Sequence, residues 1–147
     1  MKQVREVFEI RQIIEGYVTQ ALGKRLTPSD LMKLDRLIKK QEEQAARNDN
    51  ESFIETDREF HVFLASRMDN QRLESILQNL RDQMHLMGIY ALKNRERAEQ
   101  VLAEHIEILK ALKEADARKA QKAMIRPLKN TETIIVDMIR EERQGRG

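Results

Sequence analysis

Residues 53–70, FIETDREFHVFLASRMDN, carry the pattern that decides the fold of this chain. The large apolar residues of this stretch recur at helical spacing on one stripe, which predicts an amphipathic helix packed against a core: Phe53, Phe60, Leu64 and Met68. Asp57 and His61 lie on the same stripe. Because they are four residues apart, a helix stacks them one turn apart, about 6 Å along its axis. The helix therefore directs a carboxylate and an imidazole at the core.

Two interpretations of this inward polar pair stay open. Buried polar side chains are costly unless they are satisfied, so the pair can be a hydrogen-bonded structural contact. Aspartate and histidine are also ligands that divalent transition metals accept. His105 recurs at helical intervals with Val101 and Ile108, so it points inward as well. This third inward donor favours a metal site made by Asp57, His61 and His105.

The composition fits one helical domain. The chain has 147 residues, of which 35% are charged and 40% apolar, with only 5 Gly and 2 Pro, as expected for helices with solvated outer faces. The net charge of +2 gives no reason to expect nucleic acid or a membrane surface as a direct partner. Because cysteine is absent, disulfides and thiolate metal sites are excluded. No apolar run reaches transmembrane length and no secretory signal is present, so we expect a cytoplasmic protein.

The apolar periodicity predicts six helical segments and no strand. The segments are about 4–24, 28–47, 50–69, 71–93 and 98–115, and a last one capped by Asp116. Thr27, Pro28 and Asp30 form a helix-start signal with a capping box. Pro127 lies on the inner stripe of the last segment, where we expect it to kink or restart the helix. Long helices joined by short loops predict an antiparallel bundle.

Several charged side chains interrupt or border the apolar stripes. In segment 71–93 the predicted core stripe is Leu73, Ile76, Leu77, Leu80, Met84 and Met87, and Arg81 and His85 lie beside it. Arg11 interrupts the apolar face of the first segment. An inward guanidinium can pair with a carboxylate at the core edge, or it can anchor an anionic ligand, and both interpretations stay open. Residues 93–99 are highly charged and are expected to form an exposed junction.

Catalytic motifs give little support for an enzyme. The sequence has no Gly-rich phosphate loop, no GxSxG elbow and no HExxH pair. A metal-dependent enzyme that activates water at Asp57, His61 and His105 is one alternative, but no spare carboxylate stands out as a general base. A purely structural module, whose inward polar residues pair with one another, is the other. We expect the chain not to be an enzyme.

A set of short motifs, in order along nearly the whole chain, resembles a known family. The motifs are Phe8-Glu9-x-Arg11-x-x-Ile14-Glu15, Leu26-Thr27-x-x-Asp30-Leu31, Asp57-x-x-Phe60-His61, Asn70-x-x-Leu73, Glu104-His105-x-x-Ile108-Leu109, Ala111 to Asp116 and the alanine-rich run from Ala120 to Leu128. They are similar to the C-terminal effector-binding domain, or FCD domain, of the FadR-like subfamily of GntR transcription regulators. The resemblance implies an all-α antiparallel bundle of six or seven helices. It also implies a single effector-binding and dimerisation domain over residues 1–147.

The resemblance also implies a divalent metal, often zinc, nickel or manganese, held by one aspartate and three histidines. Asp57, His61 and His105 match the first three ligands. Pro127 stands before Leu128 where the family has its fourth histidine, and proline has no donor atom for a metal. The resemblance thus leaves open a three-ligand site completed by water or effector, and a weakened or empty site. His85 would join the pocket only if its helix turned it inward.

The function that the resemblance implies is the control of transcription by a small organic acid. The effector would bind in a central pocket beside the metal, with Arg11 as the main candidate anchor for its carboxylate and Arg81 and His85 as weaker candidates. We expect DNA to be bound only through a winged helix-turn-helix domain outside this chain. We also expect a homodimer and no association with a membrane.

Overall fold

Seven helices make up the part of the chain that the structure, a computed structural model, describes, which is residues 1–145. They are α1 (Lys2–Leu22), α2 (Pro28–Ala46), α3 (Asn50–Ser66), α4 (Gln71–Gln83), α5 (His85–Ala91), α6 (Arg95–Lys113) and α7 (Ala117–Gly145). No strand occurs within these residues. The predicted all-α bundle is therefore confirmed. No helix in residues 1–145 combines the length and the apolar character needed to cross a membrane.

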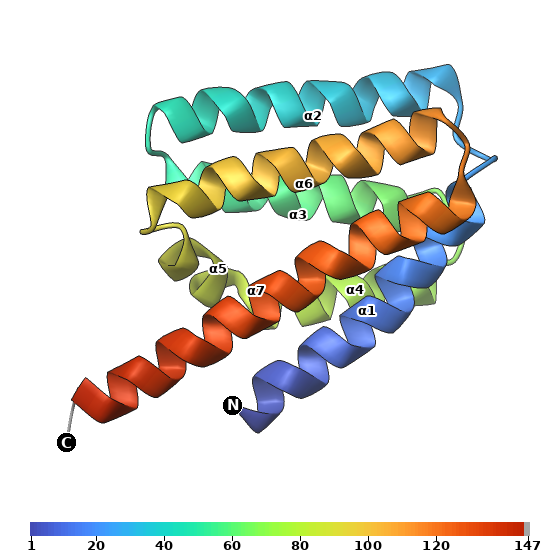
Figure 1. Ribbon diagram of the computed structural model, residues 1–147. Helices are drawn as coiled ribbons and strands as arrows, with labels where there is room; N and C mark the ends of the chain where they lie inside the picture. Colours follow the sequence, from blue (N-terminus) through green and yellow to red (C-terminus); the bar gives the residue numbers. More distant parts are fainter. Residues whose placement is uncertain (146–147) are drawn as a thin grey trace.

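The helices form two groups that face each other (Figure 1), and a cavity lies between them. The first and last helices, α1 and α7, run antiparallel and side by side, so that the described ends of the chain lie at the same end of the bundle. α2, α3 and α6 form the opposite side, and α4 and α5 close the remaining gap. Phe8 of α1 and Phe60 of α3 are fully buried where these groups meet. The inner stripe of residues 53–70 thus faces the centre, as its periodicity predicts.

Polar caps begin the helices where the sequence predicts them. The Thr27 hydroxyl accepts a hydrogen bond from the backbone N–H of Asp30 at 3.1 Å, and the Asp30 carboxylate accepts one from the Thr27 N–H at 3.0 Å. This is the predicted capping box, with Pro28 in the first helical position. Asp116 accepts a bond from the N–H of Lys119 at 3.0 Å and so caps the start of α7. These caps satisfy backbone donors that have no partner within the helix.

Removal of the α2 cap provides a first prediction. Thr27→Ala should lower the free energy of unfolding by about 0.5–2 kcal/mol, because it leaves the N–H of Asp30 without its acceptor. Thr27→Ser keeps the hydroxyl and should stay within about 0.5 kcal/mol of the wild type. Urea denaturation of the three proteins measures the difference. Equal midpoints for Thr27→Ala and the wild type would show that water replaces the cap without cost.

The segment predicted as one helix over 71–93 is two helices. The chain leaves helical geometry at Met84 (φ −103°, ψ 3°), so α4 ends at Gln83 and α5 begins at His85. The predicted core stripe is wrong at two positions, because Ile76 is 50% exposed and Met87 is 37% exposed. The break turns α5 across the end of the central space, where it packs on α3 and α7. Local periodicity continues through Met84, and only this packing places the break.

Of the two outcomes predicted for Pro127, a kink or a restart of the last helix, the restart does not occur. α7 continues through Pro127 and extends to Gly145. A proline inside a helix removes one backbone hydrogen bond and crowds the preceding turn. Here Pro127 is buried, and α7 packs against α1 and α6. Tertiary packing therefore outweighs the local cost of the proline.

Candidate functional site

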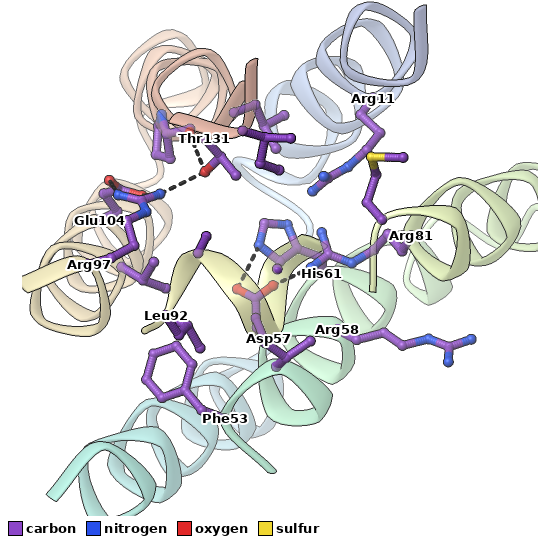
Figure 2. A pocket seen from close by; sticks show the side chains of 18 of the residues that line it. Arg11, Phe53, Asp57, Arg58, His61, Arg81, Leu92, Arg97, Glu104 and Thr131 are labelled. Atoms are coloured by element: carbon purple, nitrogen blue, oxygen red, sulfur yellow. Dashed lines mark hydrogen bonds and ion pairs between the residues drawn. The ribbon is translucent and has the colours of Figure 1, made fainter. Parts of the chain in front are cut away.

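The central space contains a cavity of about 90 Å³. Residues from six helices line it, and of the described helices only α2 contributes none. A water molecule needs at least about 10–15 Å³ of such space, so the cavity has room for several waters or one small organic molecule. Phe8, Phe53 and Leu92 give it an apolar lining, and two polar groups face each other across it (Figure 2).

The first polar group contains the three predicted metal ligands. Asp57 and His61 on α3 meet His105 on α6, and one donor atom from each lies within 4.8 Å of the others. The Nε2 atom of His105 is 3.0 Å from Oδ1 of Asp57, and the Nε2 atom of His61 is 3.5 Å from the same oxygen. The structure thus brings the three side chains together at one point, as the inward stripes of their helices predict.

Two further residues hold the imidazoles in this orientation. The Nδ1 atom of His61 is 2.5 Å from Oε1 of Glu15 on α1, and the Nδ1 atom of His105 is 2.7 Å from Oε1 of Gln41 on α2. The Nε2 of Gln41 donates to the carbonyl of Phe53 at 3.4 Å, which directs its oxygen toward His105. Both partners are acceptors, so each imidazole carries its proton on Nδ1 and presents the Nε2 lone pair.

This hydrogen-bond pattern suits a cation. With both protons on Nδ1, the Nε2 lone pairs of His61 and His105 converge on Oδ1 of Asp57, which is itself an acceptor. Burial lowers the pKa of His105, although the nearby Asp57 carboxylate acts in the opposite direction, and this disfavours an extra proton on the imidazole. A divalent metal ion among the three atoms would satisfy all of them. The donor set therefore fits the metal that the resemblance implies.

A buried ion-pair network borders the same point. Glu15 accepts a hydrogen bond from Nε of Arg11 at 3.0 Å, and its Oε1 lies 3.6 Å from Nη1 of Arg81. Burial by itself raises the pKa of Glu15, but Arg11, His61 and Arg81 outweigh it and hold the pKa well below the usual value. Burial likewise raises the pKa of Asp57, and Arg81 and the two histidines hold it well below its usual value. Both carboxylates are thus ionised at neutral pH.

Arg81 of α4 keeps unused donors in this network. Its Nη2 donates to Oδ2 of Asp57, which leaves Oδ1 for the two histidines. The Nε and Nη1 atoms of Arg81 are buried and have no hydrogen-bond partner among the described residues. Arg11 differs, because its Nε is paired with Glu15. Buried guanidinium donors without acceptors are uncommon, and they mark the position of a missing acceptor.

The second polar group lies on the opposite wall, between α6 and α7 (Figure 2). Arg97 is only 4% exposed. Its guanidinium binds the Glu104 carboxylate through two contacts of 2.7 and 3.3 Å and donates to the Thr131 hydroxyl at 2.6 Å. The expectation that residues 93–99 form an exposed junction is therefore wrong at Arg97. The carboxylate of Glu104 allows this cation to be buried in the cavity wall.

The predicted residue His85 and the cation Arg58, which was not predicted, lie at the margin of the cavity. His85 is partly exposed, and its Nδ1 is 3.5 Å from Oε1 of Glu55, so it lies outside the metal triad. Arg58 lines the cavity, but its guanidinium binds Asp82 at 2.8 Å and points away from the centre (Figure 2). Pro127 lines the cavity on the α7 side, where the resemblance places a fourth histidine. No other protein donor takes that place in the described cluster.

Sequence reasoning missed the supporting residues of the site. Gln41 follows Leu34 and Leu37 on the inner stripe of α2, so its spacing was an available signal. Glu15 lies one turn after Arg11, and that spacing predicts an ion pair on one helix face. Arg97 and Thr131 gave no such signal, because their surroundings in the sequence are polar.

Known proteins share this fold and sequence pattern. The family model of the FCD domain matches residues 6–130. The HTH-type transcriptional repressor RspR of Escherichia coli K12 is 27% identical over 144 residues, which cover 98% of this chain and 61% of RspR. The HTH-type transcriptional regulator YdhC of Bacillus subtilis 168 is 25% identical over 126 residues, which cover 84% of this chain and 56% of YdhC. These relatives are transcriptional regulators rather than enzymes, and this chain spans less than two thirds of their length.

Solved structures agree on the fold. McbR/YncC of E. coli superposes with a TM-score of 0.85 and 21% identity, over 94% of this chain and 70% of that one. A GntR protein of Streptococcus agalactiae superposes with a TM-score of 0.77 and 24% identity, over 90% of this chain and 58% of that one. At these identities the likeness concerns the arrangement of the helices alone.

Proposed function

Because this chain belongs to the FCD domain family, we propose that it is the ligand-sensing domain of a GntR-type transcription regulator with a small organic acid as its effector. The relatives named above are transcriptional regulators, which supports the regulatory role. In this proposal residues 1–147 form one domain, and a winged helix-turn-helix domain outside the chain binds DNA. The full protein acts in the cytoplasm as a homodimer.

The observation that carries the proposal is the guanidinium of Arg81. Its Nε and Nη1 atoms are buried in the cavity region without acceptors, next to a carboxylate whose other oxygen faces two histidines. A carboxylate oxygen of a ligand can accept a charge-assisted hydrogen bond from either of these free donors. Arg81 is therefore the main anchor in this proposal, ahead of Arg11, whose Nε already donates to Glu15.

A divalent metal at Asp57, His61 and His105 would strengthen the same site. Zinc, nickel and manganese are the candidates, and the metal would supply positive charge beside Arg81. Three protein residues would leave a coordination position on the metal for an oxygen of the effector. Pro127 places no competing donor on the α7 side. His85 pairs with Glu55 at the margin of the cavity, so it would contact only the outer end of a bound effector.

Calorimetry with a panel of small organic acids tests the anchor. In Arg81→Lys the positive charge remains, but the free guanidinium donors Nε and Nη1 are lost, so the best acid should bind about 10–100-fold more weakly, or about 1.5–3 kcal/mol. Arg58→Lys is the matched control, because this cation pairs with Asp82 away from the centre. We expect the control to bind within about threefold of the wild type.

Three outcomes of this experiment can be told apart. Weaker binding in Arg81→Lys alone supports Arg81 as the anchor. Equal loss in Arg11→Lys would show that both cations hold the ligand, as the sequence suggested. If no acid binds the metal-supplemented wild type, the proposed effector class is wrong.

A further inference from the structure

We propose that Arg97, Glu104 and Thr131 form a second ligand-binding subsite, the α6–α7 clasp. This subsite binds a hydroxyl group at the end of the effector that lies farthest from Arg81. The inference rests on the proposed function and narrows it. The effector would be a small hydroxy acid, with its carboxylate near Arg81 and its hydroxyl at the clasp. No residue of the clasp belongs to the metal triad or to the Arg81 network.

The clasp is a built polar site within an otherwise apolar wall. Arg97 is 4% exposed, and its Nη1 and Nη2 atoms bind both oxygens of Glu104. Nη2 also donates to the Thr131 hydroxyl at 2.6 Å, and that hydroxyl donates to the carbonyl of Pro127 at 3.0 Å. All four residues line the cavity. A buried cation and its carboxylate are costly to desolvate, and packing alone does not require them in a cavity wall.

The acceptors that remain in the clasp define the group that it can bind. The Thr131 hydroxyl uses its proton and one lone pair, and its second lone pair remains available. Each oxygen of Glu104 accepts one bond from Arg97, and a carboxylate can accept about four in total. The free capacity of Thr131 and Glu104 therefore consists of acceptors, and a ligand group that binds these two residues must donate a hydrogen bond.

The charge balance of the clasp selects a neutral donor. A second carboxylate on the ligand has no hydrogen to donate and would be repelled by Glu104. An ammonium group would donate, but it would lie against the guanidinium of Arg97. A hydroxyl carries no charge and donates one hydrogen bond, so it is the group that fits both constraints.

One cavity connects the two polar groups, and Pro127 lines it. Thr131 follows Pro127 by one helical turn on α7, so both face the same side of the cavity. A histidine ligand at position 127 would extend toward the metal and divide this space. The proline ring is smaller than a histidine side chain and offers no donor, and Asp57 and Thr131 line the same cavity, so one ligand can contact both sides. The cavity of about 90 Å³ limits such a ligand to a few carbon atoms.

The test compares matched acids by calorimetry on the metal-supplemented protein. Each straight-chain acid of three to five carbons is paired with its ω-hydroxy derivative and with the dicarboxylate of the same length. We expect one hydroxy acid to bind about tenfold more tightly than its parent acid, the gain of one hydrogen bond to a charged group. The dicarboxylate should bind more weakly than the hydroxy acid.

Variants of the clasp should change this selectivity in predictable directions. Thr131→Val keeps the shape of the side chain and should reduce the tenfold preference to about threefold or less, with the parent acid little affected. Thr133→Val is the matched control, because Thr133 makes the same kind of bond to Lys129 on the exposed side of α7. Glu104→Gln removes the repulsion and should raise the affinity of the dicarboxylate relative to the hydroxy acid.

The outcomes separate the two proposals. If acids bind without a preference for hydroxyl, or if Thr131→Val and Glu104→Gln leave the preference unchanged, the clasp is structural and the inference is wrong, while the acid-sensing function stands. If no acid of any series binds, both proposals fail. A preference that Thr131→Val lowers and Thr133→Val leaves intact supports the inference.

Discussion

Glu15→Gln is expected to lower the free energy of unfolding by about 3–5 kcal/mol, the cost of removing one partner from a buried ion pair. Glu15 is 2% exposed and lies between Arg11, His61 and Arg81. Without its charge, two buried guanidinium groups share one remaining carboxylate, Asp57. In a domain of this size such a loss corresponds to a fall in Tm of roughly 6–20 °C.

Glu6→Gln is the matched control for this prediction. Glu6 also lies on α1 and pairs with a cation four residues away, but the pair with Lys2 is exposed. An exposed pair of this kind contributes little, so we expect a change within about 0.5 kcal/mol. Thermal unfolding followed by circular dichroism measures both variants. Similar stability for the two variants would show that water or a neutral network replaces Glu15 without cost.

The pH dependence of stability provides a second measurement of the same group. The pKa of Glu15 is lower in the folded protein than its usual value of 4.5. Its contribution is therefore fully present above about pH 4.5 and is lost as the pH falls through the lower, folded-state pKa. The difference in stability between the wild type and Glu15→Gln should shrink as the pH is lowered below 4.5. A difference that stays constant there would assign the effect to packing rather than to charge.

Zinc, nickel or manganese in excess is expected to stabilise the protein by about 2.7–4.1 kcal/mol at 100 to 1,000 times the dissociation constant. A metal that binds only the folded state shifts the unfolding equilibrium by mass action. The fold brings the donor atom of His105 to those of Asp57 and His61, although His105 is distant from both in the sequence. The corresponding rise in Tm is roughly 5–16 °C for a domain of this size.

His105→Gln should remove most of this response, because it replaces one of the three metal donors with a weaker one. His85→Gln is the matched control, since His85 pairs with Glu55 outside the triad. Elemental analysis of the purified proteins gives a readout that does not depend on stability. A wild type that binds no metal and shows no change in Tm would leave the triad as a hydrogen-bonded contact between α3 and α6.

The orientation of the site residues follows from helical periodicity alone. A helix repeats every 3.6 residues, so Asp57 and His61 share a face with Phe60 and Leu64, and that face is buried. The same rule directs Arg11 and His105 inward. The capping box at Thr27 is equally local, because its two hydrogen bonds span three residues. Each of these features depends on neighbours within one or two turns, and the sequence displays them directly.

The tertiary structure decided which of these inward groups are already satisfied. Arg11 and Arg81 look alike in the sequence, but Glu15 pairs with Nε of Arg11, and two donors of Arg81 lack acceptors. The difference arises where α1, α3 and α4 meet, which no local pattern encodes.

The sequence by itself determined the helical class, the inward faces and the three candidate metal ligands. The packing of distant helices decided the break at Met84 and the burial of Arg97. It also decided the hydrogen bond from Arg97 on α6 to Thr131 on α7. The physical reason is the range of the interactions. Helix periodicity and capping act between residues a few positions apart, while the environment of a buried charge depends on every helix that excludes water from it.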